Sequence, residues 1–166
     1  MVASPPGWVD YVLALSFSRR CLMAKYAMTV RTHRPAEEVF DLLADMRNAS
    51  SWDPGVTSAT RVPGPTNDHL AVGTVFLVNV AFLGRARTIP YTVTEYERPR
   101  RLVLLGEDDW IRSVDTVTVQ PTDDACDVAY GAVLELKKAA VLSPLLALAF
   151  RGVGRRAQAG LVRVLT

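Results

Sequence analysis

Two alternating stretches of the chain carry the side chains that are best suited to chemistry. Tyr91, Val93 and Glu95 share one face of the first stretch, and Asp115 and Val117 share one face of the second. Successive side chains of a strand point to opposite faces, so each group lies on one side of a sheet. If that side is the interior, Asp115 is a buried carboxyl group that needs a partner or a raised pKa. A carboxyl group of this kind is suited to proton transfer.

The alternative is that the opposite faces of these two stretches point to the interior. On the first stretch that face carries Thr88, Thr92 and Thr94, which suit a sheet face that is exposed to solvent. We therefore predict that the face with Tyr91, and not the threonines, lines an apolar cavity and contacts ligand. Over residues 126–136 both faces are nearly apolar, so the pattern leaves the inward face open.

Two histidines offer a second source of proton transfer. His33 lies just before the first predicted helix, and because histidine is a residue type that can serve as a base, it is an alternative to Asp115. A solvated turn residue without chemistry is the competing interpretation of His33. His69 lies in a loop over residues 63–72 and is expected to be exposed. No cysteine, second histidine or carboxylate pair stands at ligand spacing, so we predict neither a metal site nor a cofactor.

The segment after Asp108-Asp109 offers two more candidates for ligand contact. Trp110 can cover a cavity mouth, and Arg112 can bind a ligand carboxylate or phenolate. An ordinary hairpin end with surface charge is the alternative. Trp52 is expected to anchor a short helix to the sheet, and Asp53 to stabilise the turn that follows it.

The elements that must position these side chains follow in a clear order. Leu22 to Thr32 is typical of a strand, and Arg34-Pro35 begins a helix that runs to about Met46. Residues 47–52 predict a second short helix. Six further strands are predicted over residues 56–62, 74–82, 85–96, 101–107, 112–120 and 126–136.

The last stretch predicts one long amphipathic helix. Ser143-Pro144 begins it, and arginines lie off its apolar stripe. The stripe consists of Leu146, Phe150, Val153, Ala157, Leu161 and Val164. We expect Phe150 and Val153 to contact ligand beside the sheet. Gly152, Gly154 and Gly160 either leave cavity volume or allow close packing on the sheet.

This order predicts an α+β fold in which a curved antiparallel β-sheet is wrapped around a long C-terminal α-helix, with two short helices after the first strand. Residues 23–166 form the predicted domain. Residues 1–22 are predicted to be an N-terminal extension that is helical, through Trp8, Tyr11, Val12 and Leu15, or disordered, or a product of an over-extended gene start.

The totals exclude several classes of protein. The chain has 166 residues and a net charge of only +2, so its overall electrostatic field does not favour binding of nucleic acid. Its two cysteines, Cys21 and Cys126, fit thiols better than a disulfide framework. The apolar run from Val9 to Phe17 is too short to span a membrane and lacks the flanks of a signal peptide. We therefore expect a cytoplasmic protein.

Four segments carry a resemblance to a known family: residues 34–45 (RPAEEVFDLLAD), Asn48 with residues 52–56 (WDPGV), Gly73-Thr74, and residues 96–102 (YERPRRL). They resemble the START-like helix-grip superfamily (SRPBCC), especially its bacterial polyketide cyclase/dehydrase and lipid-transport branch, over about residues 23–165. The resemblance implies an apolar cavity between the sheet and the long helix. Family members bind lipids, sterols, hormones or polyketides, and some catalyse aromatic ring closure or dehydration. The family has no universal catalytic residue to carry over.

Three functions follow as hypotheses. The leading one is binding of a hydrophobic small molecule or lipid, oriented by Tyr91, Trp110 or Arg112. The second is a cyclase or dehydratase in which Asp115 or His33 takes a proton while Tyr91 or Arg112 stabilises an enolate. The third is a non-catalytic protein-interaction module that docks through the arginine side of the last helix or through residues 8–17. The oligomeric state is left open.

Overall fold

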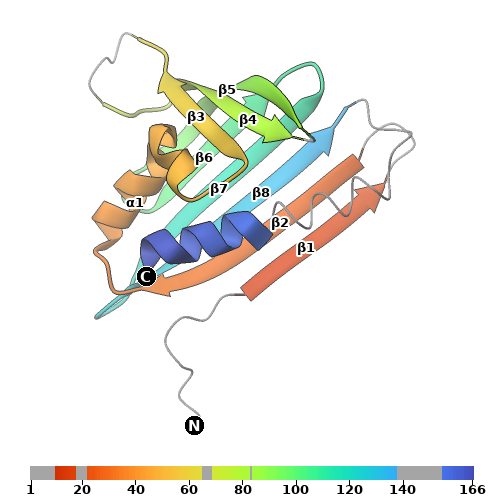
Figure 1. The fold of residues 1–166 in the computed structure, drawn as a ribbon. Helices are drawn as coiled ribbons and strands as arrows, with labels where there is room; N and C mark the ends of the chain where they lie inside the picture. The colour runs from red at the N-terminus through yellow and green to blue at the C-terminus, as the bar shows by residue number, and fades with distance from the viewer. Residues whose placement is uncertain (1–9, 18–21, 65–68, 83, 138–154) are drawn as a thin grey trace.

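A computed structural model describes residues 10–17, 22–64, 69–82, 84–137 and 155–166 of the chain. Eight strands form one antiparallel sheet in the order β1-β2-β8-β7-β6-β5-β4-β3 (Figure 1). The strands are β1 (Asp10–Phe17), β2 (Leu22–Thr32), β3 (Val56–Arg61), β4 (Val75–Phe82), β5 (Arg85–Glu97), β6 (Arg101–Glu107), β7 (Ile111–Pro121) and β8 (Cys126–Leu136). Between β2 and β3 lie α1 (Ala36–Ala44) and the 3-10 helix η1 (Met46–Ser51), and residues 155–165 form the C-terminal helix.

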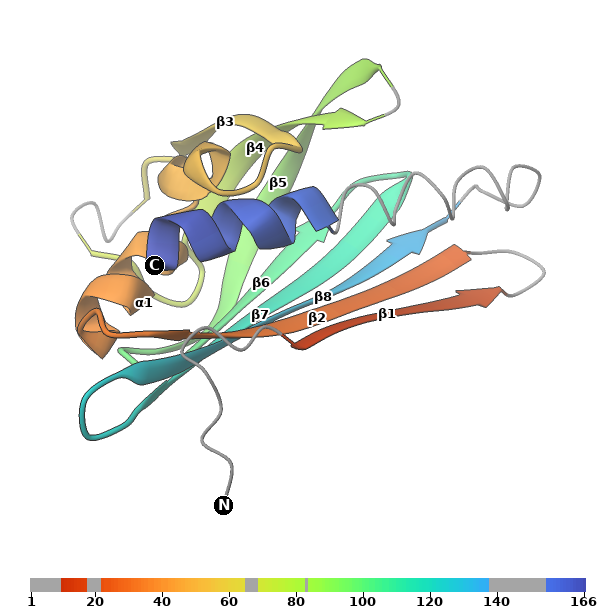
Figure 2. The same cartoon turned by 60° about the horizontal axis from the view of Figure 1, so that its bottom comes forward.

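The sheet curves, and the C-terminal helix lies against its concave side next to η1 and β3 (Figure 2). The predicted α+β fold, with a curved antiparallel sheet around a C-terminal helix, is therefore confirmed. Each of the seven strands predicted after residue 21 forms, with ends within one residue of those expected. Alternation explains this accuracy: along β7 the residues from Ile111 to Val119 alternate between buried and more exposed positions.

The N-terminal stretch is a correction to the sequence-based expectation. Asp10–Phe17 was predicted as part of a helical or disordered extension, and it forms strand β1 instead. It pairs antiparallel with β2, from Asp10 opposite Thr29 to Phe17 opposite Leu22. The eight residues are too few for a helical stripe to be distinguished from alternation, and the edge of β2 supplies unpaired backbone groups that a strand can satisfy. Trp8 and the remaining residues of the extension lie outside the described part of the chain.

The two short helices cover one end of the sheet. In α1 the acidic residues Glu37 and Glu38 lie in the first turn, and Val39, Phe40 and Leu43 are buried. The helix ends at Ala44, two residues earlier than predicted, because Asp45 begins η1: its side chain accepts a hydrogen bond from the Arg47 amide at 3.0 Å.

No helix among the described residues is long and apolar enough to cross a membrane. Cys126 is a buried free thiol.

The C-terminal helix is held by contacts along its last two turns. Ala157, Leu161 and Leu165 are buried against the sheet. Thr32 and Arg34 donate hydrogen bonds to the carbonyl groups of Leu165 and Val164, which satisfies carbonyls that have no partner within the helix. The predicted helix start at Ser143-Pro144 and the stripe residues Leu146, Phe150 and Val153 lie outside the described residues, as do Arg151, Gly152 and Gly154.

Gly160 sets the distance between this helix and the turn after η1. A methyl group at this position would lie 1.9 Å from the carbonyl oxygen of Trp52. Only glycine allows so close an approach. Of the two roles considered for Gly160 from the sequence, close packing is therefore the one that the structure supports, and not added cavity volume. Arg163 supports the same contact, because its guanidinium donates a hydrogen bond to the Ser51 carbonyl at 2.9 Å.

Gly160→Ala is expected to destabilise the fold because the helix must move away from Trp52. The loss of unfolding free energy should be about 1–3 kcal/mol, even though alanine is the better helix former by roughly 1 kcal/mol. Urea unfolding followed by tryptophan fluorescence measures it. Ala159→Ser, at the exposed neighbouring position, is the matched control and should cost little. A Gly160→Ala chain as stable as the wild type contradicts the contact.

Candidate functional site

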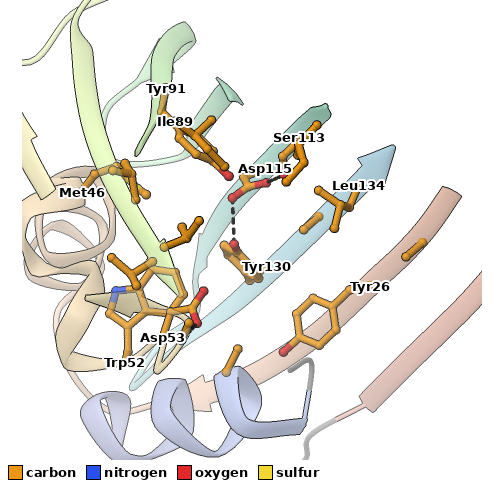
Figure 3. Close-up of a pocket in the computed structure, with 18 of the residues that line it drawn as sticks. Tyr26, Met46, Trp52, Asp53, Ile89, Tyr91, Ser113, Asp115, Tyr130 and Leu134 are labelled. Atoms are coloured by element: carbon orange, nitrogen blue, oxygen red, sulfur yellow. Dashed lines mark hydrogen bonds between the residues drawn. The ribbon is translucent and has the colours of Figure 1, made fainter. Parts of the chain in front are cut away.

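A cavity of about 180 Å³ lies between the concave face of the sheet and the elements that cover it. Its walls come from β2, β4, β5, β7, β8 and the start of β3, from η1 and the turn after it, and from Ala157 of the C-terminal helix (Figure 3). Most of the lining is apolar, as with Val78, Ile89 and Leu134. The C-terminal helix and the turn after η1, which meet at Gly160, both contribute to these walls.

The polar centre of the cavity is Asp115 on β7, which is 7% exposed. Ser113, two residues earlier on the same face, donates its hydroxyl proton to Oδ1 of Asp115 at 2.6 Å. Tyr130 of β8 donates to Oδ2 at 3.0 Å (Figure 3). The register places Val117 opposite Tyr130, two pairs along from Asp115 and on the same face, so the tyrosine reaches the carboxyl group diagonally across the two strands. Two hydroxyl groups therefore hold the carboxyl group in place.

Burial decides the protonation of Asp115. The pKa of this carboxyl group is raised to about 6, chiefly by loss of solvation and to a smaller extent by the negative charge of Asp53, although the hydrogen bonds from Ser113 and Tyr130 favour the ionised form. The pKa of Tyr130 is raised well above its ordinary value, mainly by burial and then by the charge of Asp115. Tyr130 therefore remains a hydrogen-bond donor, while Asp115 can change protonation near neutral pH.

Asp53 is a second carboxyl group in the cavity wall. Its Oδ1 accepts a hydrogen bond from the Gly55 amide at 2.8 Å, which confirms the predicted role in the turn. The side chain also lines the cavity, and burial raises its pKa. Sequence reasoning missed this second role, because only the docking of η1 against the sheet brings Asp53 near Asp115.

Tyr91 lines the cavity from β5, as the choice of inward face predicted. Its ring lies against Gly106, its register partner on β6, where a methyl group would come within 2.4 Å of Cζ. Glycine at this position therefore gives the ring room to lie flat on the neighbouring strand. Burial, followed by the charge of Asp115, raises the pKa of Tyr91 far above its ordinary value, so the phenol remains protonated.

Aromatic rings complete the wall. Trp52 packs on Tyr130 edge to face, with 5.4 Å between ring centroids. Tyr26 of β2 also packs on Tyr130 edge to face, with 5.9 Å between ring centroids. The Tyr26 hydroxyl donates to Sδ of Met28 at 2.7 Å. Trp52 is buried and anchors η1, as expected, but it also contacts the cavity. Tyr130 was not predicted, because both faces of β8 are nearly apolar in sequence. Ser113 was not predicted either, although it lies two residues before Asp115 on the same strand and therefore shares its inward face.

Glu95 is a correction. It was predicted to share the inward face with Tyr91 and Val93, and it is exposed and paired with Arg101 at 2.6 Å. The register of β5 on β6 shifts between Val93 and Glu95, so a bulge reverses the alternation after Val93. Val93 and Val117 do point inward, with 1% and 2% exposure, but they pack in the core beyond the described cavity lining.

The other predicted contacts also lie away from the cavity. Trp110 is 48% exposed with the Arg87 guanidinium 5.5 Å from its ring centre, and Arg112 is exposed on the outer face of β7. Neither residue belongs to the described cavity lining: the prediction that Arg112 lines the cavity is wrong, and the prediction that Trp110 covers its mouth stays a prediction. His33 is exposed, with Nδ1 3.1 Å from the Asp124 carbonyl, as its solvated-turn alternative expected. Phe150 and Val153 lie outside the described residues. No group of three potential metal ligands occurs in the part of the chain that the structure describes.

Comparisons with known proteins agree with this architecture. A family model described as polyketide cyclase/dehydrase and lipid transport matches residues 23–166. A START superfamily protein from Mycobacterium smegmatis is 14% identical with a TM-score of 0.68, over 85% of this chain and 96% of that chain. No protein with a curated function matches.

Two further solved structures share the fold. A STAR-related lipid transfer protein from Xanthomonas axonopodis is 14% identical with a TM-score of 0.65, over 93% of this chain and 98% of that one. An aromatase/cyclase from Streptomyces is 15% identical with a TM-score of 0.65, over 86% and 91%. At such identities the likeness extends to the fold alone.

Asp115→Asn is expected to change how stability depends on pH. The carboxyl group has a pKa of about 6 in the folded chain and 3.8 as its unperturbed value. Between these values the folded chain holds the proton more tightly, and above them it contains a buried carboxylate that the unfolded chain solvates. Wild-type stability should therefore fall relative to Asp115→Asn by up to about 3 kcal/mol as pH rises from about 4 to 7.

Urea unfolding of the two proteins across that pH range measures the difference. Asp127→Asn is the control, because Asp127 is paired with Arg31 and its pKa is lowered, so its effect has the opposite sign and falls at lower pH. A difference between wild type and Asp115→Asn that does not vary with pH contradicts the raised pKa.

Proposed function

The chain belongs to the polyketide cyclase/dehydrase and lipid transport family, and on that premise we propose that it binds a small hydrophobic molecule in the cavity between the sheet and the C-terminal helix. The observation that carries the proposal is a mostly apolar cavity in which a buried carboxyl group, Asp115, is held in place by two hydroxyl donors. Such a site combines apolar burial with a point of orientation, which is the usual composition of a small-molecule pocket.

The volume restricts the size of the ligand. An apolar cavity of about 150 Å³ is sufficient for benzene, whereas drug-sized ligands occupy roughly 300–1,000 Å³. At about 180 Å³ the cavity has room for one or two rings, or for the end of a longer molecule. A compact aromatic or alicyclic ligand therefore fits better than an entire acyl chain.

Ala132→Phe is expected to reduce ligand binding because it places a ring in the cavity. Ala132 lines the cavity from β8, whereas Ala129 on the same strand is exposed. Ala129→Phe is therefore the matched control: it adds the same ring outside the cavity. Native mass spectrometry of the protein as purified, followed by extraction, identifies a resident ligand, and fluorescence titration with an apolar aromatic probe gives the affinity. We expect at least a tenfold loss for Ala132→Phe and no loss for Ala129→Phe.

Two outcomes contradict the binding function. One is a protein that carries no ligand and takes up no apolar probe. The other is equal uptake by Ala132→Phe and Ala129→Phe, which would place the probe outside the cavity.

A second candidate function is catalysis of the cyclase or dehydratase type, and the geometry of Asp115 favours it. A carboxylate in the cavity wall with a pKa near 6 can take a proton from a methylene group between two carbonyls of a neutral substrate. The electron pair then passes to the adjacent carbonyl oxygen. Tyr91 remains protonated and lines the same space, so it can donate a hydrogen bond to that enolate, whereas Tyr130 already donates its hydroxyl proton to Asp115.

The catalytic hypothesis predicts that Asp115→Asn lowers the turnover of a poly-β-ketone substrate by about 10²–10⁴-fold, because a positioned base contributes that much. The rate of the wild type should rise with pH through about 6, as Asp115 ionises. Asp127→Asn changes an exposed carboxylate outside the cavity and should leave turnover unchanged. Turnover by Asp115→Asn equal to that of the wild type removes this function and leaves the binding function in place.

A further inference from the structure

The charge of the cavity wall is negative. Two carboxyl groups, Asp53 and Asp115, line it, and the described lining includes no lysine, arginine or histidine. Several acidic side chains elsewhere in the described part of the chain are paired with cations, as Asp41 is with Arg98 and Asp127 with Arg31. The cavity carboxyl groups instead have hydroxyl and amide donors: Ser113 and Tyr130 for Asp115, and the Gly55 amide for Asp53. They therefore lack a counter-charge within the described protein.

The aromatic side chains of the wall are suited to a cation as well. Tyr26, Trp52, Tyr91 and Tyr130 all line the cavity, and they come from three strands and from the turn after η1. Trp52 and Tyr26 pack on Tyr130 within 6 Å between centroids. Aromatic rings attract ammonium groups through their quadrupole, most strongly where water is excluded. Rings and carboxyl groups thus surround the same small space (Figure 3).

The cavity wall is unfavourable for an anionic ligand. A buried carboxylate needs a cation or several donors, and in this wall it would lie beside two carboxyl groups. Both of these have raised pKa values, chiefly through burial, which reflects the cost of negative charge in this space. A bound ammonium group offsets that cost, because it supplies the missing positive charge at short range.

We propose that the ligand of this cavity is a small protonated amine, whose apolar or aromatic body fills the space and whose ammonium group pairs with Asp115 and Asp53. The proposal rests on the binding function above and narrows it from hydrophobic molecules in general to cationic ones. It predicts discrimination by charge among ligands of one shape. The amine nitrogen donates to lone pairs of Asp115 that remain beyond the bonds from Ser113 and Tyr130.

Three probes of nearly equal size test the proposal: 2-phenylethylamine, 2-phenylethanol and phenylacetate, which are cationic, neutral and anionic near neutral pH. Isothermal titration calorimetry of the full chain gives the three affinities. We expect the amine to bind at least tenfold more tightly than the alcohol, and the carboxylate more weakly than the alcohol. Asp115→Asn and Asp53→Asn should each reduce amine affinity about tenfold or more and leave alcohol affinity unchanged.

The alcohol also reports whether each variant keeps its folded cavity, because Asp53 supports a turn. Glu95→Gln removes an exposed carboxylate outside the cavity and should leave amine affinity unchanged. If the alcohol binds as tightly as the amine, the charge proposal fails and the binding function stands. If none of the three probes binds, both fail. If the amine binds equally well to wild type, Asp115→Asn and Asp53→Asn, its site is not this cavity and the proposal fails.

Discussion

The close contact between Gly160 and the backbone of Trp52 determines where the C-terminal helix lies. A helix has no preferred position on a smooth apolar sheet, since hydrophobic burial is not directional. Here the missing side chain at Gly160 lets the helix meet the turn after η1, and Thr32 and Arg34 fix its end through the last carbonyl groups. The cavity is the space that remains when both elements are fixed, so its shape depends on this contact more than on any residue of its lining.

The same docking gives Asp115 its unusual environment. An aspartate on a strand can easily be paired at the surface, as Asp127 is with Arg31. Asp115 is instead buried with hydroxyl donors, and the resulting rise in pKa is a cost to folding at neutral pH. Surrounding groups that would be expected to stabilise the charge, such as a lysine or arginine, are absent from the described lining. A carboxyl group retained at such a cost in a cavity is more readily explained by function than by stability.

The sequence was sufficient for the seven strands after residue 21, and for the inward face with Tyr91 and Asp115, because strict alternation reports which face is buried. Prediction from the sequence failed where a bulge interrupted the alternation of a strand, or where both faces of a strand were apolar. The bulge after Val93 turned Glu95 outward, and the two apolar faces of β8 gave no sign that Tyr130 faces the cavity. Asp53 was recognised for its turn but not for the cavity, because its position depends on how η1 docks. Local patterns therefore predict which residues are buried, whereas the partners of a buried group depend on packing between distant elements.

The two uses considered for Asp115 place opposite demands on its pKa. A general base acting on a neutral substrate is most effective when its pKa lies near the working pH, and a value of about 6 suits that role. An ammonium ligand stabilises the ionised carboxylate, lowers this pKa and makes the group a weaker base. Tight binding of an amine and proton abstraction from a neutral ketone are therefore competing uses of one carboxyl group. In the unliganded cavity the hydroxyl donors hold Asp115 ready for either, and the charge of the ligand decides between them.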